Sequence, residues 1–122
     1  MKPIYYIACS GSKSINDYEF VATHIAGAIK DVAEKHRICF LLSDESGVPF
    51  MVHQYAKTMG MMVQYFPTHW NELKGRAPVV RNKEMLAEAN AVIVFWDGMN
   101  SQGLELGRMA KEAGTPMKAY RL

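Results

Sequence analysis

Uninterrupted runs of apolar residues alternate along the chain with stretches in which apolar side chains recur every three or four positions. The run 91–94 is too continuous for a strand with one face in water, which is typical of a parallel strand covered on both sides. Further apolar runs at 4–8, 38–42, 61–66 and 117–120 complete a set of five predicted strands. Helices are predicted at about 16–37, 49–58, 78–89 and 105–113, with Asn16 as the first N-cap and an irregular connection at 67–77.

This alternation predicts an α/β three-layer sandwich, with helices on both faces of a five-stranded parallel sheet. The expected strand order is 3-2-1-4-5, which puts the topological switch point between the first and fourth strands. A chain of 122 residues has room for one domain, residues 1–122. Such sheets bind ligands at the switch point, outside the carboxyl ends of the strands, so we expect the functional site there.

A polar loop with a glycine follows the first strand at this switch point. It contains Ser10, Gly11, Ser12 and Lys13. Its spacing is neither that of a Walker loop nor that of a dinucleotide fingerprint, so the sequence supports neither a nucleoside triphosphatase nor a Rossmann dehydrogenase. Its hydroxyls, backbone amides and ammonium can still hold a single phosphate. A plain strand-to-helix turn is the alternative interpretation.

A second glycine-containing loop follows the fourth strand and leads into the last helix. Gly98, Ser101 and Gly103 lie in this loop, and Glu105 falls in the first turn of the helix. A glycine loop before a helix collects free backbone N–H groups and the positive end of the helix dipole, which favours an anion. Glu105 either compensates that dipole or has a chemical role.

Four more side chains are candidates at the same edge of the sheet. Arg81 and Asn82 open the third helix, where a guanidinium suits a phosphate or a ribose-linked carboxylate. A solvated helix residue is the alternative for Arg81. Trp70 and Trp96 flank this region and can stack on a base, although packing at the rim would equally explain Trp96.

Three motifs occur in order at 66–70 (FPTHW), 81–86 (RNKEML) and 95–103 (FWDGMNSQG), after an opening at 8–13 (ACSGSK) and 16–19 (NDYE). They resemble the YspA-like family of the SLOG (SMF/DprA-LOG) superfamily, whose pattern is roughly F-P-A-x-W, R-N-x-x-M and F-W-D-G-x-S-x-G-T, with G-S-R and N-D-Y-E near the start. The resemblance covers nearly the whole chain. It implies a Rossmann-like domain that binds a nucleotide or a nucleotide-derived signal.

Two departures from that family bear on function. The family's G-G-A-x-G-A-D stretch is DESGVP at 44–49, so Pro49 replaces its aspartate. The segment GLELGR at 103–108 is similar to nucleoside 2-deoxyribosyltransferases and deoxynucleoside monophosphate N-glycosidases. That similarity implies that Glu105 attacks the anomeric carbon of the sugar or stabilises its cation. Asp97 and Glu45 are the candidate acids for the leaving base.

Two functions therefore compete for the same site. In the first, the chain binds a nucleotide or nucleotide-derived ligand as a sensor or sequestering module. In the second, it hydrolyses or transfers the N-glycosidic bond of nucleoside 5′-monophosphates.

Composition and charge limit the kinds of partner and cofactor that we expect for this chain. A net charge of +2, with scattered Lys and Arg, argues against nucleic acid. No apolar run approaches the ~20 residues of a membrane span, and the start is not a secretory signal, so a cytoplasmic protein is expected. The histidines lack metal-ligand spacing, and Cys9 and Cys39 are expected at opposite ends of the sheet, so we expect no metal, disulfide or cofactor. Family analogy implies a homodimer or larger homo-oligomer.

Overall fold

Five strands form one parallel sheet in this computed structural model, in the predicted order β3-β2-β1-β4-β5. Each pairing between neighbours is parallel, which confirms the predicted sheet. The structure describes residues 1–99 and 101–122, without the side chains of residues 101 and 102. The strands are β1 (Ile4–Gly11), β2 (Arg37–Ser43), β3 (Met62–Phe66), β4 (Ala91–Trp96) and β5 (Met117–Arg121).

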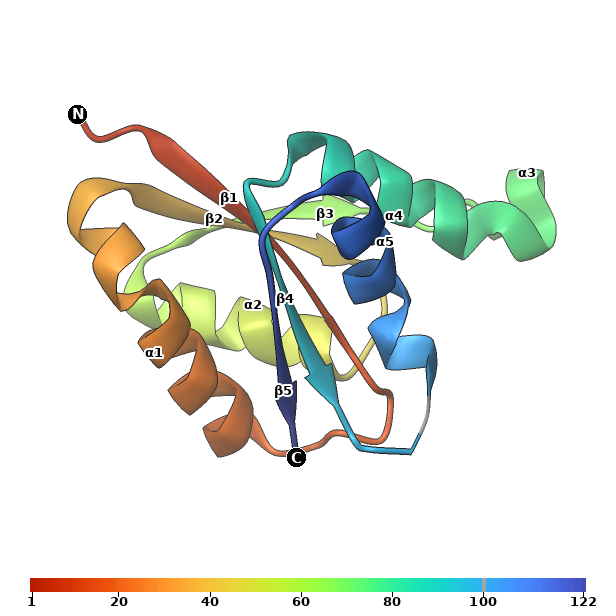
Figure 1. The fold of residues 1–122 in the computed structure, drawn as a ribbon, viewed down its shortest axis with the longest axis horizontal. Helices are drawn as coiled ribbons and strands as arrows, with labels where there is room; N and C mark the ends of the chain where they lie inside the picture. Colours follow the sequence, from red (N-terminus) through yellow and green to blue (C-terminus); the bar gives the residue numbers. More distant parts are fainter. Residues whose placement is uncertain (100) are drawn as a thin grey trace.

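Helices cover both faces of the sheet. They are α1 (Tyr18–Lys35), α2 (Val48–Met59), α3 (Trp70–Leu73), α4 (Ala77–Glu88) and α5 (Glu105–Ala113), with short 3₁₀ helices η1 (Lys74–Arg76) and η2 (Ser101–Leu104). Helices α1 and α2 pack on one face, and α4 and α5 pack on the other (Figure 1). The arrangement is the predicted three-layer, Rossmann-like sandwich.

Alternate residues of the central strands enter two separate cores. In β4, Ile93 and Phe95 belong to the core beneath α1 and α2, whereas Val92 and Val94 belong to the core beneath α4 and α5. Each fully buried side chain of this kind contributes about 1.5–3 kcal/mol to folding. Because neither face meets water, the strand has no polar alternation, which is why its sequence is a continuous apolar run.

The first strand and the first helix both depart from the predicted bounds. β1 extends past Ala8 to Gly11, which pairs with Phe95 of β4. The first helix is capped by Asp17 and not by Asn16, because the Asp17 carboxylate accepts a hydrogen bond from the Phe20 N–H at 3.0 Å. These adjacent residues are equally good caps by type, so only the path of the chain selects between them.

The connection at 67–77, predicted to be irregular, contains α3 and η1. These have 4 and 3 residues, too few to show a helical period in the sequence. Pro78 lies in the first turn of α4, where its missing N–H costs nothing, as predicted. Helices α2 and α5 end at Gly60 and Gly114, both in the left-handed conformation that glycine favours.

The two cysteines are free, as predicted. Cys39 pairs in register with Tyr6, and the two cysteine side chains enter different cores. Cys9 is fully buried, and this burial raises the pKa of its thiol, which is typical of a cysteine that serves as a packing group.

Among the residues that the structure describes, no helix is both long enough and apolar enough to cross a bilayer.

Candidate functional site

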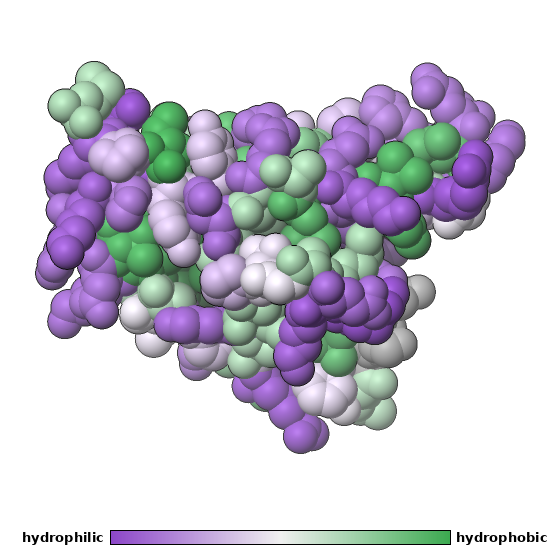
Figure 2. All heavy atoms as spheres, turned by 45° about the horizontal axis from the view of Figure 1, so that its top comes forward, coloured by the Kyte–Doolittle hydropathy of each residue, from purple (hydrophilic) through white to green (hydrophobic). Residues whose placement is uncertain are grey.

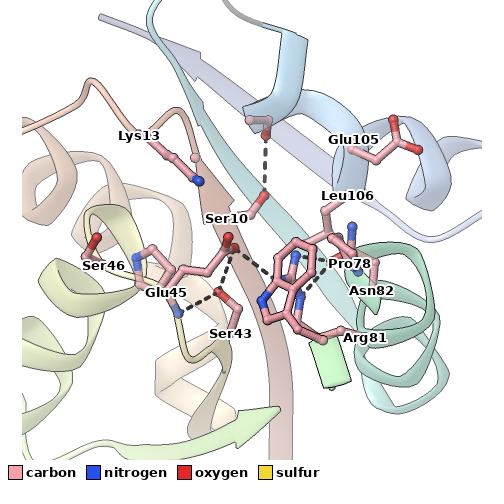
Figure 3. A pocket seen from close by; sticks show the side chains of 14 residues that line it. Ser10, Lys13, Ser43, Glu45, Ser46, Pro78, Arg81, Asn82, Glu105 and Leu106 are labelled. Carbon is pink, nitrogen blue, oxygen red and sulfur yellow. Dashed lines mark hydrogen bonds and ion pairs between the residues drawn. The ribbon is translucent and has the colours of Figure 1, made fainter. Parts of the chain in front are cut away.

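A cavity of about 360 Å³ opens at the carboxyl edge of the sheet, beside the predicted switch point. Its volume is near the lower end of the range for small-molecule sites. Strands β1 and β2, the start of α2, the α3–α4 region and the start of α5 all contribute to it (Figure 3). Its lining comprises Ser10, Gly11, Lys13, Ser43, Glu45, Ser46, Pro49, Trp70, Pro78, Arg81, Asn82, Gly103, Glu105 and Leu106.

Two glycines allow close packing of backbone at the cavity. A Cβ on Gly103 would lie 2.4 Å from the Ser12 nitrogen, and a Cβ on Gly11 would lie 2.4 Å from Cγ2 of Val48. The Ser10 hydroxyl also donates to the Gly103 carbonyl oxygen at 3.4 Å. Two of the three predicted glycines therefore line the cavity, Gly11 and Gly103, and their lack of a side chain brings η2 and α2 against the end of β1.

The N-termini of α2, α4 and α5 converge on the cavity. Pro49, Pro78 and Glu105 lie in the first turns of these helices, and each lines it. Among the described residues, no side chain caps any of the three helix starts. The positive ends of three helix dipoles therefore act on the same space, which favours an anionic ligand.

Arg81 is a buried cation in the cavity wall, 7% exposed. Its Nη1 donates to Oε1 of Glu45 at 3.0 Å and to Oγ1 of Thr68 at 2.8 Å, and its Nη2 donates to Oδ1 of Asn82 at 3.0 Å. Thr68 in turn donates from Oγ1 and from its N–H to the Asp44 carboxylate, at 2.9 and 3.2 Å. The guanidinium is thus fixed from several directions, so a ligand would meet its charge together with that of Glu45.

Glu45 places a carboxylate in the middle of the site (Figure 3). It follows the end of β2, and its Oε1 accepts hydrogen bonds from Arg81 and from the Ser43 hydroxyl, the latter at 3.3 Å. In the sequence, Glu45 is one of two alternative acids. Its ion pair with Arg81, across 36 residues of chain, makes it the central carboxylate of the cavity.

Glu105 is the first residue of α5 and lies at the rim. Both of its carboxylate oxygens accept hydrogen bonds from Arg108, and the carboxylate points away from Ser10 and Glu45 (Figure 3). The hydrogen bond from Arg108 lowers the pKa of Glu105, against a smaller opposing effect of burial. Glu105 is therefore held as an anion, and it has to rotate to reach the centre of the cavity.

Asp97, the other predicted acid, joins two loops. Its Oδ2 accepts from the Ser14 hydroxyl at 2.5 Å, its Oδ1 accepts from the Met99 N–H at 2.8 Å, and its own N–H donates to Oγ of Ser12 at 3.2 Å. Neither Asp97 nor Ser12 is among the described residues that line the cavity. Their contacts give both residues a structural role, and a role in chemistry or binding stays a prediction.

Trp96 and Gly98 also lie outside the described lining of the cavity. The Arg121 guanidinium lies over the Trp96 ring, 5.4 Å from its centroid. Gly98 has a φ of +86°, and a Cβ there would lie 2.5 Å from Nε of Arg121. These two residues accommodate β5 and its arginine. The side chain of Ser101 lies outside the described residues.

Lys13 and Trp70 are exposed residues of the lining that come from separate loops. The Lys13 ammonium points toward Ser10 (Figure 3). Trp70 begins α3 and is 53% exposed, which leaves much of its indole available to a ligand. Both residues, like Arg81 and Asn82, therefore line the cavity, and their roles in binding a ligand stay predictions.

Several residues of the lining had no individual signal in the sequence. They share only a position on the carboxyl edge, at the end of a strand, in the loop after it or in the first turn of a helix, and they are Ser43, Ser46, Pro78 and Leu106.

Comparison of the chain with models of protein families, with curated proteins and with solved structures gives no match. The resemblance to SLOG domains therefore stays a prediction that rests on the motifs.

Proposed function

We propose that the cavity binds a nucleotide or nucleotide-derived ligand, and that the chain is a sensor or sequestering module for that ligand. The observation that carries this proposal is the convergence of three helix N-termini at the carboxyl edge of the sheet, beside Lys13 and Arg81. Helix N-termini and cations together attract a phosphate. Trp70 supplies an aromatic surface for a base at the same cavity.

The size and position of the cavity favour a single nucleotide unit. Its volume of about 360 Å³ suits one base, one sugar and one phosphate better than a dinucleotide. Lys13 is the cation best placed for the phosphate, because Arg81 is already paired with Glu45. The backbone at Lys13 also lies beside the start of α2, since the Lys13 carbonyl oxygen is 3.9 Å from the ideal Cβ position of Gly47.

A thermal-unfolding screen tests the proposal with nucleoside monophosphates, ADP-ribose and cyclic dinucleotides. A monophosphate at 100 times its Kd should stabilise the protein by about 2.7 kcal/mol. Lys13→Ala should reduce this stabilisation because it removes the cation for the phosphate. Lys30→Ala, on the exposed surface of α1, should leave it unchanged. Absence of stabilisation by every phosphate-bearing nucleoside would contradict the proposal.

A second candidate function is cleavage of the N-glycosidic bond of a nucleoside 5′-monophosphate. Two carboxylates at one cavity favour it, with Glu105 held as an anion and Glu45 nearer the centre. An ionised carboxylate stabilises an oxocarbenium-like centre, or attacks it, and a second carboxyl group can serve the leaving base. Both functions use the same cavity, so the release of free base distinguishes them.

If the chain is an N-glycosidase, Glu105→Gln should slow the release of base roughly 100-fold while nucleotide binding persists. Because Arg108 lowers the pKa of Glu105, the wild-type rate should hold as the pH falls and decline only below the ordinary carboxyl range. Arg108→Gln should move this decline to higher pH. Glu112→Gln is the control, since Glu112 also binds Arg108 but does not line the described cavity. A wild type that binds nucleotide without releasing base excludes this function.

Association between copies of the chain stays a prediction. On the face drawn in Figure 2, apolar side chains form separate patches between charged and polar ones. The exposed large apolar residues include Phe50 and Tyr65, which are 57% and 46% exposed. Nothing in the described part of the chain identifies a partner surface.

A further inference from the structure

The carboxylate of Glu45 has one oxygen bound within the protein and one oxygen available to a ligand. Oε1 accepts hydrogen bonds from Nη1 of Arg81 at 3.0 Å and from the Ser43 hydroxyl at 3.3 Å. Within the described part of the chain, no hydrogen bond reaches Oε2. The side chain lines the cavity and is 33% exposed, so Oε2 can accept a hydrogen bond from whatever fills the cavity.

The ion pair between Arg81 and Glu45 also determines which chemical groups Oε2 of Glu45 can bind. Arg81 is held by Thr68 and Asn82, so the guanidinium keeps Glu45 in place and balances its charge. An ionised carboxylate only accepts hydrogen bonds, and it repels a phosphate. The part of the ligand next to Glu45 must therefore not be anionic and must carry a donor, such as a hydroxyl group.

The strand order determines which part of a nucleotide reaches Glu45. Lys13 follows β1, Glu45 follows β2 and Trp70 follows β3, and these strands are adjacent in the sheet in that order. With the phosphate at Lys13 and the base at Trp70, the sugar lies between them, at Glu45. The sugar is also the middle part of a nucleoside 5′-monophosphate.

We propose that Glu45 binds a hydroxyl group of the sugar, so that the cavity selects ribonucleotides over 2′-deoxyribonucleotides. The 2′-hydroxyl group of the ribose donates to Oε2 of Glu45, with Arg81 and Ser43 as the positioning residues behind it. A site built to bind a hydroxyl discriminates against a ligand that lacks it. This inference rests on the proposed function, and it specifies the class of nucleotide that the cavity binds.

Calorimetric titration of the intact chain with ribonucleoside 5′-monophosphates and their 2′-deoxy counterparts tests the inference. For the base that binds best, the ribo form should bind roughly 10- to 100-fold more tightly, the usual range for a hydrogen bond to a charged acceptor. Glu45→Ala should bring this ratio close to one. Glu45→Gln keeps an acceptor for Arg81 and should reduce the ratio. Glu34→Gln, on the exposed surface of α1, should leave it unchanged.

The outcomes separate this inference from the proposed function. If no monophosphate binds the wild type, both fail. If ribo and deoxy forms bind the wild type equally well, the inference fails while nucleotide binding stands. If a folded Glu45→Ala variant still binds the ribo form more tightly than the deoxy form, another residue recognises the sugar and the inference is overturned. Should Glu45→Ala unfold, an unchanged ratio in the Glu45→Gln variant overturns the inference in the same way.

Discussion

Replacement of Arg81 by methionine is expected to lower the free energy of unfolding by about 3 kcal/mol, the lower end of the usual cost of removing one partner of a buried ion pair, because Glu45 is 33% exposed. Arg81 is 7% exposed and donates to Glu45, Thr68 and Asn82, so its loss leaves these acceptors without their donor. Methionine fills a volume similar to that of arginine. The decrease in the free energy of unfolding therefore measures the lost polar contacts more than the effect of a new cavity. Urea-induced unfolding, followed by circular dichroism, measures the change.

Three variants separate this effect from simple loss of charge. Lys83→Met, on the exposed surface of the same helix, should change stability by no more than about 0.5 kcal/mol. Arg81→Lys keeps the charge but cannot keep the forked hydrogen bonds, so it should be intermediate. The double variant Arg81→Met with Glu45→Gln should lose less than the sum of the single variants, because it removes both charges. An Arg81→Met protein as stable as the Lys83→Met protein would show that the network contributes little.

Gly103→Ala is expected to destabilise the fold by about 3 kcal/mol, at the upper end of the usual cost of overpacking. The new Cβ would lie 2.4 Å from the Ser12 nitrogen, 2.7 Å from Oγ of Ser12 and 2.8 Å from the Gly11 carbonyl carbon. Two of these are backbone atoms, and the Ser12 N–H is bonded to the Phe95 carbonyl oxygen at 2.9 Å. Relief of the contact therefore has to disturb the junction of β1 with β4. Thermal and urea-induced unfolding measure the loss.

Gly27→Ala is the matched control for this substitution. Gly27 lies within α1, and a Cβ there meets no atom within 4 Å. Alanine should stabilise the helix by about 0.5–1 kcal/mol, because glycine is the poorer helix former. The two alanine substitutions should thus have opposite signs. A Gly103→Ala protein with wild-type stability would mean that η2 does not pack against β1 as the structure has it.

The architecture could be predicted because its signals are local. The run 91–94 is apolar at each position because two cores take alternate residues, and this pattern is visible in the sequence itself. Glycine residues just after the last turn and proline residues in the first turn mark the ends and starts of helices in the same local way. The short helices between β3 and α4 have no such signal, so the sequence predicts only an irregular segment there.

The sequence predicts a site at the edge of the sheet where the cavity opens, but the contacts of its side chains could not be predicted from their neighbours in the sequence. Asp97 follows β4 beside two predicted ligand glycines, yet its carboxylate bonds to Ser14, 83 positions away. Arg81 has the residue type for a phosphate, yet its ion-pair partner lies 36 positions away. Contacts of this kind depend on how loops meet in three dimensions, and no periodicity encodes them.

The central claim, that the cavity at the carboxyl edge holds a mononucleotide, is tested most directly by backbone amide NMR during titration with a nucleoside monophosphate. We expect saturable shifts at Gly11, Lys13, Glu45 and Gly103, from separate loops that meet only at this cavity. Residues of the smaller cavity between α1 and β5, of about 220 Å³, should not shift. Shifts confined to that second cavity, or none at saturating nucleotide, would contradict the claim.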